Sequence, residues 1–329
     1  KVKIFDFKSA RHKLDKWGIK CLCLFDDLSL AVYLCGEAGG ETLDELCDSH
    51  SLSKQYPAYA VDRLFKEYRQ ILADSDCVRL YEEIEKPLVS VLYDMENEGV
   101  RVSIDALASI GTEYTNKIAR LSEEIYSDCG CVFNINSPSQ LGEVLFEKLG
   151  LKSGKKGKNG KYSTNADILE KLADENPVAG KVLKYRFFQK LLSTYIEGLK
   201  PFIDKNDKIH TTYNQTITTT GRLSSANPNI QNIPVREEEG RELRKVFIPQ
   251  DGNVFIDADY SQIELRLLAH FSGCKELIEA YNEGKDIHAI TASQVFDVPL
   301  EEVTPKMRRE AKAVNFGIIY GISEFGLSR

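Results

Sequence analysis

The residues best suited to chemistry lie near the end of the sequence, where four of them recur at intervals of four. From Pro305 the chain reads PKMRREAKAVNFGIIYG, and this stretch contains Arg308, Lys312, Phe316 and Tyr320. Each residue of an α-helix is rotated by about 100° from the one before it, so residues four apart differ by only about 40°. The four side chains therefore line one side of a helix. Two cations followed by two rings suit a nucleoside triphosphate, because cations meet phosphates and rings stack on sugar and base. The alternative is a helix with core aromatics and solvated cations.

A second candidate site is the pair of aspartates in the stretch VFIDAD, residues 254–259. The apolar residues predict a short strand over 254–259, and the amphipathic pattern that follows predicts a helix over 262–271. Residues two apart on a strand share a face, so Asp257 and Asp259 could together hold a hard divalent cation. Alternatively, one of the two caps the following helix, and the motif alone does not decide between these interpretations.

Length and composition indicate a folded protein of several domains. The 329 residues are 42% apolar and 28% charged, and a chain of this length favours two or three domains of roughly 100 to 150 residues. No run of about 18 uncharged apolar residues occurs, and the first residues do not form a signal peptide. The eight cysteines lack the spacing of a zinc site. We therefore expect a soluble, cytoplasmic protein with reduced thiols and no membrane association.

The formal charge of −7 hides a basic middle section. Residues 101–200 carry 15 basic and 12 acidic side chains, a net charge of +3, whereas the sections on either side are acidic. Within this section the stretch KSGKKGKNGK, residues 152–161, places five lysines among three glycines, which is typical of a loop. The loop is either a solvated surface feature or a flexible cationic finger that follows phosphates.

Hydrophobic periodicity predicts helices and strands in separate parts of the chain. Residues 1–78 form a small mixed unit with a short apolar segment at 21–25 and a helix near 60–72. Long amphipathic helices are predicted over 80–98 and 104–126, and Ser103 precedes the second as its N-cap.

The second half of the chain adds caps, a strand and more helices. Ser137 precedes Pro138, which predicts a helix start whose free N–H groups can receive an anion. Residues 163–165 predict another cap, followed by one helix through Tyr195. A threonine-rich strand is predicted over 210–220, and an irregular segment that contains two prolines over 227–234. Two further helices are predicted over 287–296 and 305–320. This mixture fits a sheet with helices packed on it.

Three segments together resemble one protein family. The stretch DYSQIELR, residues 259–266, resembles motif A of the family A DNA polymerases, the bacterial DNA polymerase I group. The stretch RREAKAVNFGIIYG, residues 308–321, resembles motif B, the fingers helix that closes over the incoming nucleotide. Residues 220–234, which include TGRLSS, resemble the palm segment beside the primer-template. The likeness runs almost without gaps from about Asp94 to Arg329.

The resemblance implies roles for the residues of motif A. Asp259 matches the aspartate that binds both Mg²⁺ ions, and the backbone carbonyl of Tyr260 is implied as a further ligand. The likeness also implies that Asp257 is not a ligand. Glu264 matches the residue that excludes ribonucleotides at the 2′ position and hydrogen-bonds Tyr320.

The resemblance implies contacts to nucleotide and DNA as well. Arg308, Lys312 and His288 match triphosphate contacts, and Lys312 matches the proton donor to the leaving pyrophosphate. Phe316 matches the ring against the sugar, which implies discrimination against dideoxynucleotides, and Gln262 belongs to the same nucleotide site. The implied DNA contacts lie in the thumb and the palm: Lys155, Lys156, Lys158, Lys161, Ser163, Asn165, Arg186, Lys190, Arg222, Asn229 and Gln231.

Two departures from the family pattern matter. Phosphoryl transfer in this family uses two metals held by two aspartates, and the second aspartate comes from a V-H-D-E type hairpin that does not occur here. We therefore expect the 329-residue chain to be inactive by itself.

The second departure lies at the other end of the sequence. Residues 1–78 resemble the tail of a 3′-5′ exonuclease domain, but Ala10 and Arg63 stand where metal-binding carboxylates are expected. The domain is interpreted as vestigial, with a one-residue slip that uses Asp62 as the alternative.

These observations predict an α+β multidomain chain that consists of a vestigial exonuclease-like α/β remnant, a helical thumb, a partial palm sheet and the start of the helical fingers. Four parts are expected. The remnant covers residues 1–78, and the start of the palm together with the thumb covers 79–200. The partial palm with motif A covers 201–274, and the start of the fingers with motif B covers 275–329. The predicted function is template-directed DNA polymerisation by a monomer, with Mg²⁺, dNTP and primer-template DNA as cofactor and partners. The alternatives are a non-catalytic duplex-DNA-binding module and a metal-dependent nucleotidyl or glycosyl transferase that uses Asp257 and Asp259.

Overall fold

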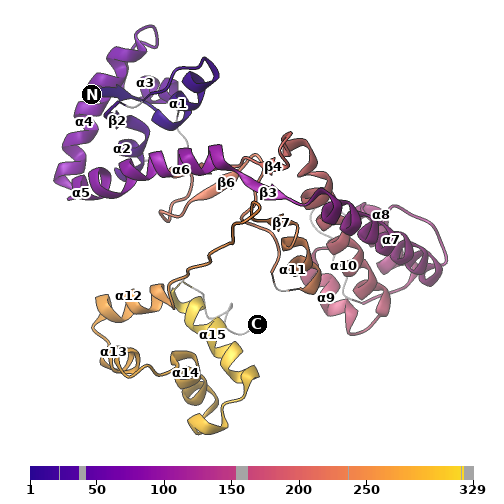
Figure 1. Ribbon diagram of the computed structural model, residues 1–329. Coiled ribbons are helices and arrows are strands. Elements are labelled where there is room, and N and C mark those ends of the chain that lie inside the picture. Colours follow the sequence, from indigo (N-terminus) through magenta and orange to yellow (C-terminus); the bar gives the residue numbers. More distant parts are fainter. Residues whose placement is uncertain (22, 37–41, 153–161, 236, 320, 322–329) are drawn as a thin grey trace. The chain divides into compact units, whose positions relative to one another are not determined.

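The structure is a computed structural model, which describes all residues except 22, 37–41, 153–161, 236, 320 and 322–329. Contacts divide the chain into two compact units, Lys1–Phe255 and Ile256–Arg329. Helices dominate both units, and the strands form three small sheets within the first, which makes the fold α+β (Figure 1). Among the described residues, no helix has the length and apolar character needed to cross a membrane. The division into four parts expected from the sequence remains a prediction.

The first core of unit Lys1–Phe255 is built around two parallel strands. Phe7 stacks on Phe25 at a ring-centroid distance of 3.8 Å, which packs the first helix onto the second strand. The helix expected near residues 60–72 is present and longer, and it buries Leu64, Phe65 and Tyr68 on one face. The elements are β1 (Val2–Ile4), α1 (Phe7–Lys16), β2 (Phe25–Asp27), α2 (Leu28–Leu34), α3 (Leu43–Ser49) and α4 (Pro57–Asp74).

A continuous helical segment then runs from residue 78 to residue 98, as predicted. It consists of α5 (Val78–Leu80), a π-helical turn η1 (Tyr81–Glu85) and α6 (Lys86–Glu98). The π-helical turn lies immediately before Pro87, which has no N–H to donate within the helix. Tyr81 is fully buried there and packs into the first core.

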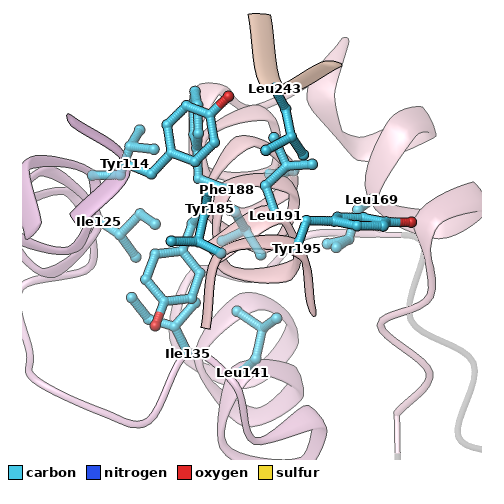
Figure 2. Packing of buried hydrophobic residues seen from close by; sticks show 14 of the residues in the cluster. Tyr114, Ile125, Ile135, Leu141, Leu169, Tyr185, Phe188, Leu191, Tyr195 and Leu243 are labelled. Atoms are coloured by element: carbon cyan, nitrogen blue, oxygen red, sulfur yellow. The ribbon is translucent and has the colours of Figure 1, made fainter. Parts of the chain in front are cut away.

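The second core of this unit is helical. The helix predicted after Ser103 is confirmed as α7 (Ile104–Cys129), and the Ser103 hydroxyl accepts the Ala106 N–H at 3.3 Å. The helix start at Ser137 is also confirmed, as α8 (Pro138–Gly142) followed by the π-helical η2 (Glu143–Lys148). Figure 2 shows side chains from α7, α8 and later helices that converge in this core, which includes Tyr114, Ile125, Leu141, Phe188 and Leu191.

The single helix expected from residue 166 to Tyr195 was a wrong prediction. The segment forms α9 (Ala166–Ala173), α10 (Pro177–Lys190) and the π-helical η3 (Leu191–Glu197). The break lies at Asn176 and Pro177, because proline cannot donate a helical hydrogen bond and Asn176 caps a new helix by accepting the Val178 N–H. The short helices η4 (Lys200–Phe202) and α11 (Glu238–Arg244) complete the helices of this unit.

The sheets in the middle of the chain are small and antiparallel. β3 (Val100–Val102) lies between β4 (Lys208–Ile209) and β7 (Phe247–Ile248), and β5 (Thr212–Asn214) pairs with β6 (Ser224–Ala226). The strand expected over 210–220 therefore forms only at 212–214. It ends there because the Gln215 side chain bonds to Glu85 of η1 and the chain then turns toward β6.

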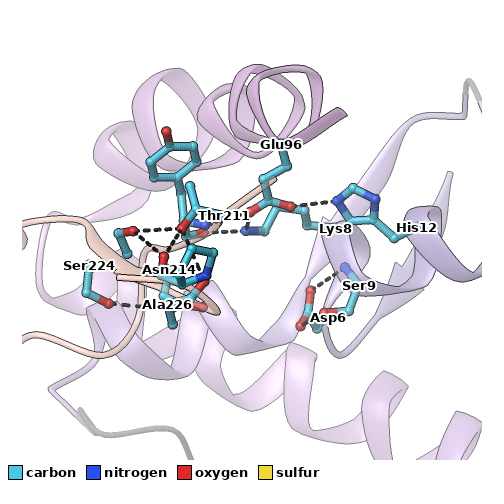
Figure 3. Close-up of polar contacts among 12 residues, drawn as sticks. Asp6, Lys8, Ser9, His12, Glu96, Thr211, Asn214, Ser224 and Ala226 are labelled. Carbon is cyan, nitrogen blue, oxygen red and sulfur yellow. Dashed lines mark hydrogen bonds and ion pairs between the residues drawn. The ribbon is translucent and has the colours of Figure 1, made fainter. Parts of the chain in front are cut away.

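A buried carboxylate links segments that lie far apart in the sequence. Glu96 of α6 is almost fully buried, accepts hydrogen bonds from His12 Nε2 at 2.6 Å and from the Tyr213 N–H at 2.7 Å, and pairs with Lys8 (Figure 3). Lys8 also donates to the Tyr213 carbonyl oxygen. Because a buried charge needs compensation, Glu96 holds α1, α6 and β5 together.

The described residues of unit Ile256–Arg329 form helices and no strand, whereas a sheet with helices packed on it was expected toward this end of the chain. The predicted helices are present as α12 (Ile263–Ser272), α14 (Ile287–Phe296) and α15 (Pro305–Ile319), with α13 (Lys275–Asn282) and η5 (Leu300–Glu302) between them. The strand expected over 254–259 was a wrong prediction. A strand needs a hydrogen-bonded neighbour, and no described strand pairs with these residues, which leaves Ile256 89% exposed.

The buried carboxyl of Asp27 generates a prediction about stability and pH. Its oxygens accept the Phe7 N–H at 2.8 Å and the Ser29 N–H at 3.0 Å, yet burial outweighs these bonds and raises the pKa of Asp27 to about 7. The folded state thus keeps this proton well above the pH at which the unfolded chain releases it. The Asp27 contribution to the free energy of unfolding therefore falls between about pH 4 and pH 7.

We expect Asp27→Asn to remove this fall, which is of the order of a few kcal/mol. Urea unfolding followed by circular dichroism at pH 5 and pH 8 measures it in both proteins. An equal loss of stability between the two pH values in wild type and Asp27→Asn would contradict the assignment.

Candidate active site

A pocket of about 390 Å³ lies within unit Ile256–Arg329, between the start of α12 and the helices α14 and α15. Its lining includes eight of the residues singled out in the sequence: Asp259, Tyr260, Gln262, Glu264, His288, Arg308, Lys312 and Phe316. Ser261 and Ile263 complete the lining, whereas Asp257 does not take part. Residues from three separate stretches of the sequence therefore meet around one cavity.

The segment that carries Asp259 is held in place by its neighbours in the sequence. Gln262 adopts the left-handed conformation with φ 53°, which is unusual for a residue with a side chain and sets the angle at which the chain enters α12. Its side-chain oxygen accepts a hydrogen bond from the Tyr281 hydroxyl at 3.0 Å. Arg266 donates to the Ser261 carbonyl at 2.9 Å and lies over the Tyr281 ring. Asp259 and Tyr260 themselves are exposed to solvent.

Arg308 and His288 are connected through the start of α14. Asp286 caps this helix by accepting the His288 and Ala289 N–H groups, and its other oxygen accepts a 2.5 Å hydrogen bond from Arg308 Nε. Burial by itself would raise the pKa of Asp286, but the Arg308 bond and the helix N–H groups hold it below its usual value. The sequence reasoning missed Asp286, although an aspartate directly before a predicted helix is a cap signal.

The His288 ring is buried and fixed by α15. Asn315 Nδ2 lies 3.1 Å from His288 Nδ1 and 3.0 Å from the Thr291 hydroxyl. The Asn315 amide therefore fixes the orientation of the imidazole ring through its contact with Nδ1. Sequence reasoning also missed Asn315, which is three residues after Lys312 and therefore near the same helix face.

Electrostatics keep His288 neutral. Burial is the largest cause that lowers the pKa of His288 below its usual value, the Arg308 and Lys312 cations lower it further, and Asp286 acts in the opposite direction. The Phe316 ring lies 5.9 Å from the imidazole, and Lys312 Nζ lies 5.9 Å from the centre of the Phe316 ring. The pocket thus combines the basic side chains of Arg308 and Lys312, the imidazole of His288 and the aromatic face of Phe316.

The remaining candidate residues divide between described and undescribed parts of the chain. Tyr320, Lys155, Lys156, Lys158 and Lys161 lie outside the described residues.

Of the thumb candidates, Ser163 and Lys190 are exposed, and Asn165 caps α9. Arg186 donates to the backbone carbonyl and the hydroxyl of Thr164, and burial lowers its pKa. Its guanidinium therefore positions the segment before α9.

Of the palm candidates, Arg222 is exposed in the connection between β5 and β6, and Asn229 and Gln231 follow β6. Asn229 accepts the Gln231 N–H at 3.0 Å, and Gln231 Nε2 donates to the Leu223 carbonyl at 3.2 Å. The buried hydroxyl of Ser225 accepts the Ile230 N–H at 3.1 Å and lies 2.7 Å from the Thr211 hydroxyl. This irregular segment is therefore fixed by side chains in place of strand pairing.

The comparison with protein families decides the identity. Residues 104–329 match the model of DNA polymerase family A. The chain belongs to DNA polymerase family A. It is 44% identical to DNA polymerase I of Caldicellulosiruptor bescii over the whole of this chain, which spans 40% of that relative.

Other members of family A give the same result. DNA polymerase I of Bacillus subtilis is 52% identical over 83% of this chain and 31% of its own length. Among solved structures, the POL domain of Pol1 from M. smegmatis in complex with DNA primer-template and dNTP has a TM-score of 0.89 and 38% identity. That match covers 98% of this chain and 59% of the solved one. This chain thus spans less than half the length of these curated polymerases.

The electrostatic account of His288 predicts its titration. We expect its pKa to lie below that of an ordinary histidine, and Asp286→Asn to lower it further, because the carboxylate stabilises the imidazolium. NMR titration of ¹³C-labelled histidines measures this, with the signal assigned by His288→Gln among the five histidines of the chain. Glu310→Gln on the exposed side of α15 is the matched control. A rise of the His288 pKa in Asp286→Asn would contradict the account.

Proposed function

We propose that this chain is part of a template-directed DNA polymerase, which adds dNTPs to a primer 3′-hydroxyl. The observation that carries the proposal is the pocket itself, which gathers Asp259, His288, Arg308, Lys312 and Phe316 from three stretches of sequence. A triphosphate matches this set, since the cations complement phosphate oxygens and the Phe316 ring offers a face to the sugar. The Pol1 structure that resembles this chain is a complex with DNA primer-template and dNTP.

The oxygen atoms that lie just before the start of α12 are suitable ligands for Mg²⁺. The Asp259 carboxylate and the Tyr260 carbonyl would hold it, because Mg²⁺ binds through one or two carboxylates together with substrate phosphates and waters. When bound, the metal neutralises charge on the reacting phosphate. We propose that the chain by itself binds nucleotide and DNA without extending a primer, because the second metal-binding aspartate of the family pattern has no counterpart in these 329 residues.

The chain's own residues divide the work of binding and proton transfer. Arg308 and Lys312 bind the phosphates, and His288 lines the pocket beside them. Lys312 Nζ donates a proton to the leaving pyrophosphate. Glu264 and Gln262, which line the same pocket, contact the sugar side of the nucleotide.

The nucleotide assignment predicts that Arg308→Ala and Lys312→Ala each weaken binding of a fluorescent dATP with Mg²⁺. The expected loss is about 10- to 100-fold, because a hydrogen bond between charged groups contributes roughly 1.5 to 3 kcal/mol. Arg309→Ala is the matched control, since Arg309 is exposed on the same helix and does not line the pocket. Equal dATP affinities in all three variants and wild type would contradict the assignment.

We also propose that the exonuclease-like remnant is inactive. Ala10 and Arg63 carry no carboxylate, and Asp62 is held at 2.5 Å by Lys3 Nζ and at 2.6 Å by Lys66 Nζ, which together lower its pKa. Two cations already neutralise this carboxylate. The chain is therefore expected not to shorten single-stranded DNA from the 3′ end in Mg²⁺. Shortening that disappears in Asp62→Ala would show that the site is active through Asp62.

A further inference from the structure

The hydroxyl of Tyr33 makes two hydrogen bonds to the connection between β5 and β6. It donates to the Thr218 carbonyl oxygen at 2.6 Å and accepts the Gly221 N–H at 3.1 Å. Tyr33 is in α2 of the exonuclease-like remnant, 185 residues before Thr218. One atom of the remnant thus binds both a carbonyl and an N–H group of a palm loop.

Side-chain hydrogen bonds also hold the loop itself. The Thr218 hydroxyl donates to the Arg222 carbonyl at 2.6 Å, and Gly221 adopts φ +75°, where a residue with a side chain is strained. Residues 219 and 220 form a turn. The hydroxyls of Tyr33 and Thr218 add hydrogen bonds that hold this turn in place.

The base of the same loop is also anchored to the rest of the first core. Gln215 Nε2 donates to the Glu85 carbonyl at 3.0 Å and to the Glu85 carboxylate at 2.7 Å. Lys8, which pairs with Glu96, holds the Tyr213 carbonyl. Tyr33 is the contact that extends this anchoring to the tip of the loop.

We propose that Tyr33 is a positioning residue for DNA binding, which holds the turn at 218–222 so that Arg222 contacts the primer-template duplex. This inference rests on the proposed function, because it takes Arg222 as a DNA contact. It assigns the remnant a role that does not need its lost carboxylates: the remnant is a scaffold for the DNA-binding surface of the palm.

Tyr33→Phe tests the proposal because it removes the hydroxyl and keeps the ring. Tyr56→Phe is the matched control, since Tyr56 is an exposed tyrosine whose hydroxyl makes no hydrogen bond in the described structure. Hydrogen exchange of the Gly221 amide reports the contact directly. We expect faster exchange of Gly221 in Tyr33→Phe, with unchanged exchange at the Tyr213 amide, which Glu96 holds. Unchanged Gly221 exchange would overturn the proposal.

DNA affinity tests the functional half of the proposal. Fluorescence anisotropy with a labelled duplex that carries a 5′ overhang measures Kd for wild type, Tyr33→Phe, Arg222→Ala and the double variant. We expect Tyr33→Phe to weaken binding about 3- to 10-fold, because it removes the hydrogen bonds that hold the turn before Arg222. The double variant is expected to bind like Arg222→Ala, because Tyr33 acts through Arg222.

The outcomes separate this inference from the function on which it rests. If wild type does not bind the duplex, the proposed function and the inference both fail. If wild type binds and Tyr33→Phe binds equally well, or if the effects of Tyr33→Phe and Arg222→Ala multiply, only the inference fails.

Discussion

The active-site arrangement depends on the contact between the start of α14 and the middle of α15. Asp286 caps α14 and pairs with Arg308, while Asn315 of α15 binds His288 of α14. These contacts fix how the two helices pack and so which residues face the pocket. The Asp286–Arg308 pair is partly exposed, and such pairs contribute only about 0 to 1 kcal/mol. Arg308 can therefore leave Asp286 at small cost, as the proposed binding of a triphosphate requires.

A different constraint organises unit Lys1–Phe255. The buried charge of Glu96 requires partners, and it finds them in His12 and Lys8 of α1 and in the backbone of β5. These contacts pack the first helix of the chain against the β5–β6 hairpin. Asp62 lies between Lys3 and Lys66 and forms an ion pair with each of them.

Local signals in the sequence predicted much of the structure. The four-residue spacing of Arg308, Lys312 and Phe316 and the caps at Ser103 and Ser137 depend only on neighbours along the chain, and all are present. The strand at 254–259 failed because a strand depends on a partner that no local pattern specifies. The contacts of Tyr33 and Asn315 could not be predicted for the same reason, since each residue forms a hydrogen bond to an element that is distant in the sequence.

The central claim is that a metal at Asp259 and a triphosphate beside α15 occupy one pocket. Paramagnetic broadening tests it, with Mn²⁺ in place of Mg²⁺ and ¹³C-labelled histidines in the 329-residue chain. In the presence of dATP, we predict that Mn²⁺ broadens the His288 signal in wild type and that Asp259→Asn abolishes the broadening. Equal broadening in both proteins, or none in wild type with dATP bound, would contradict the account.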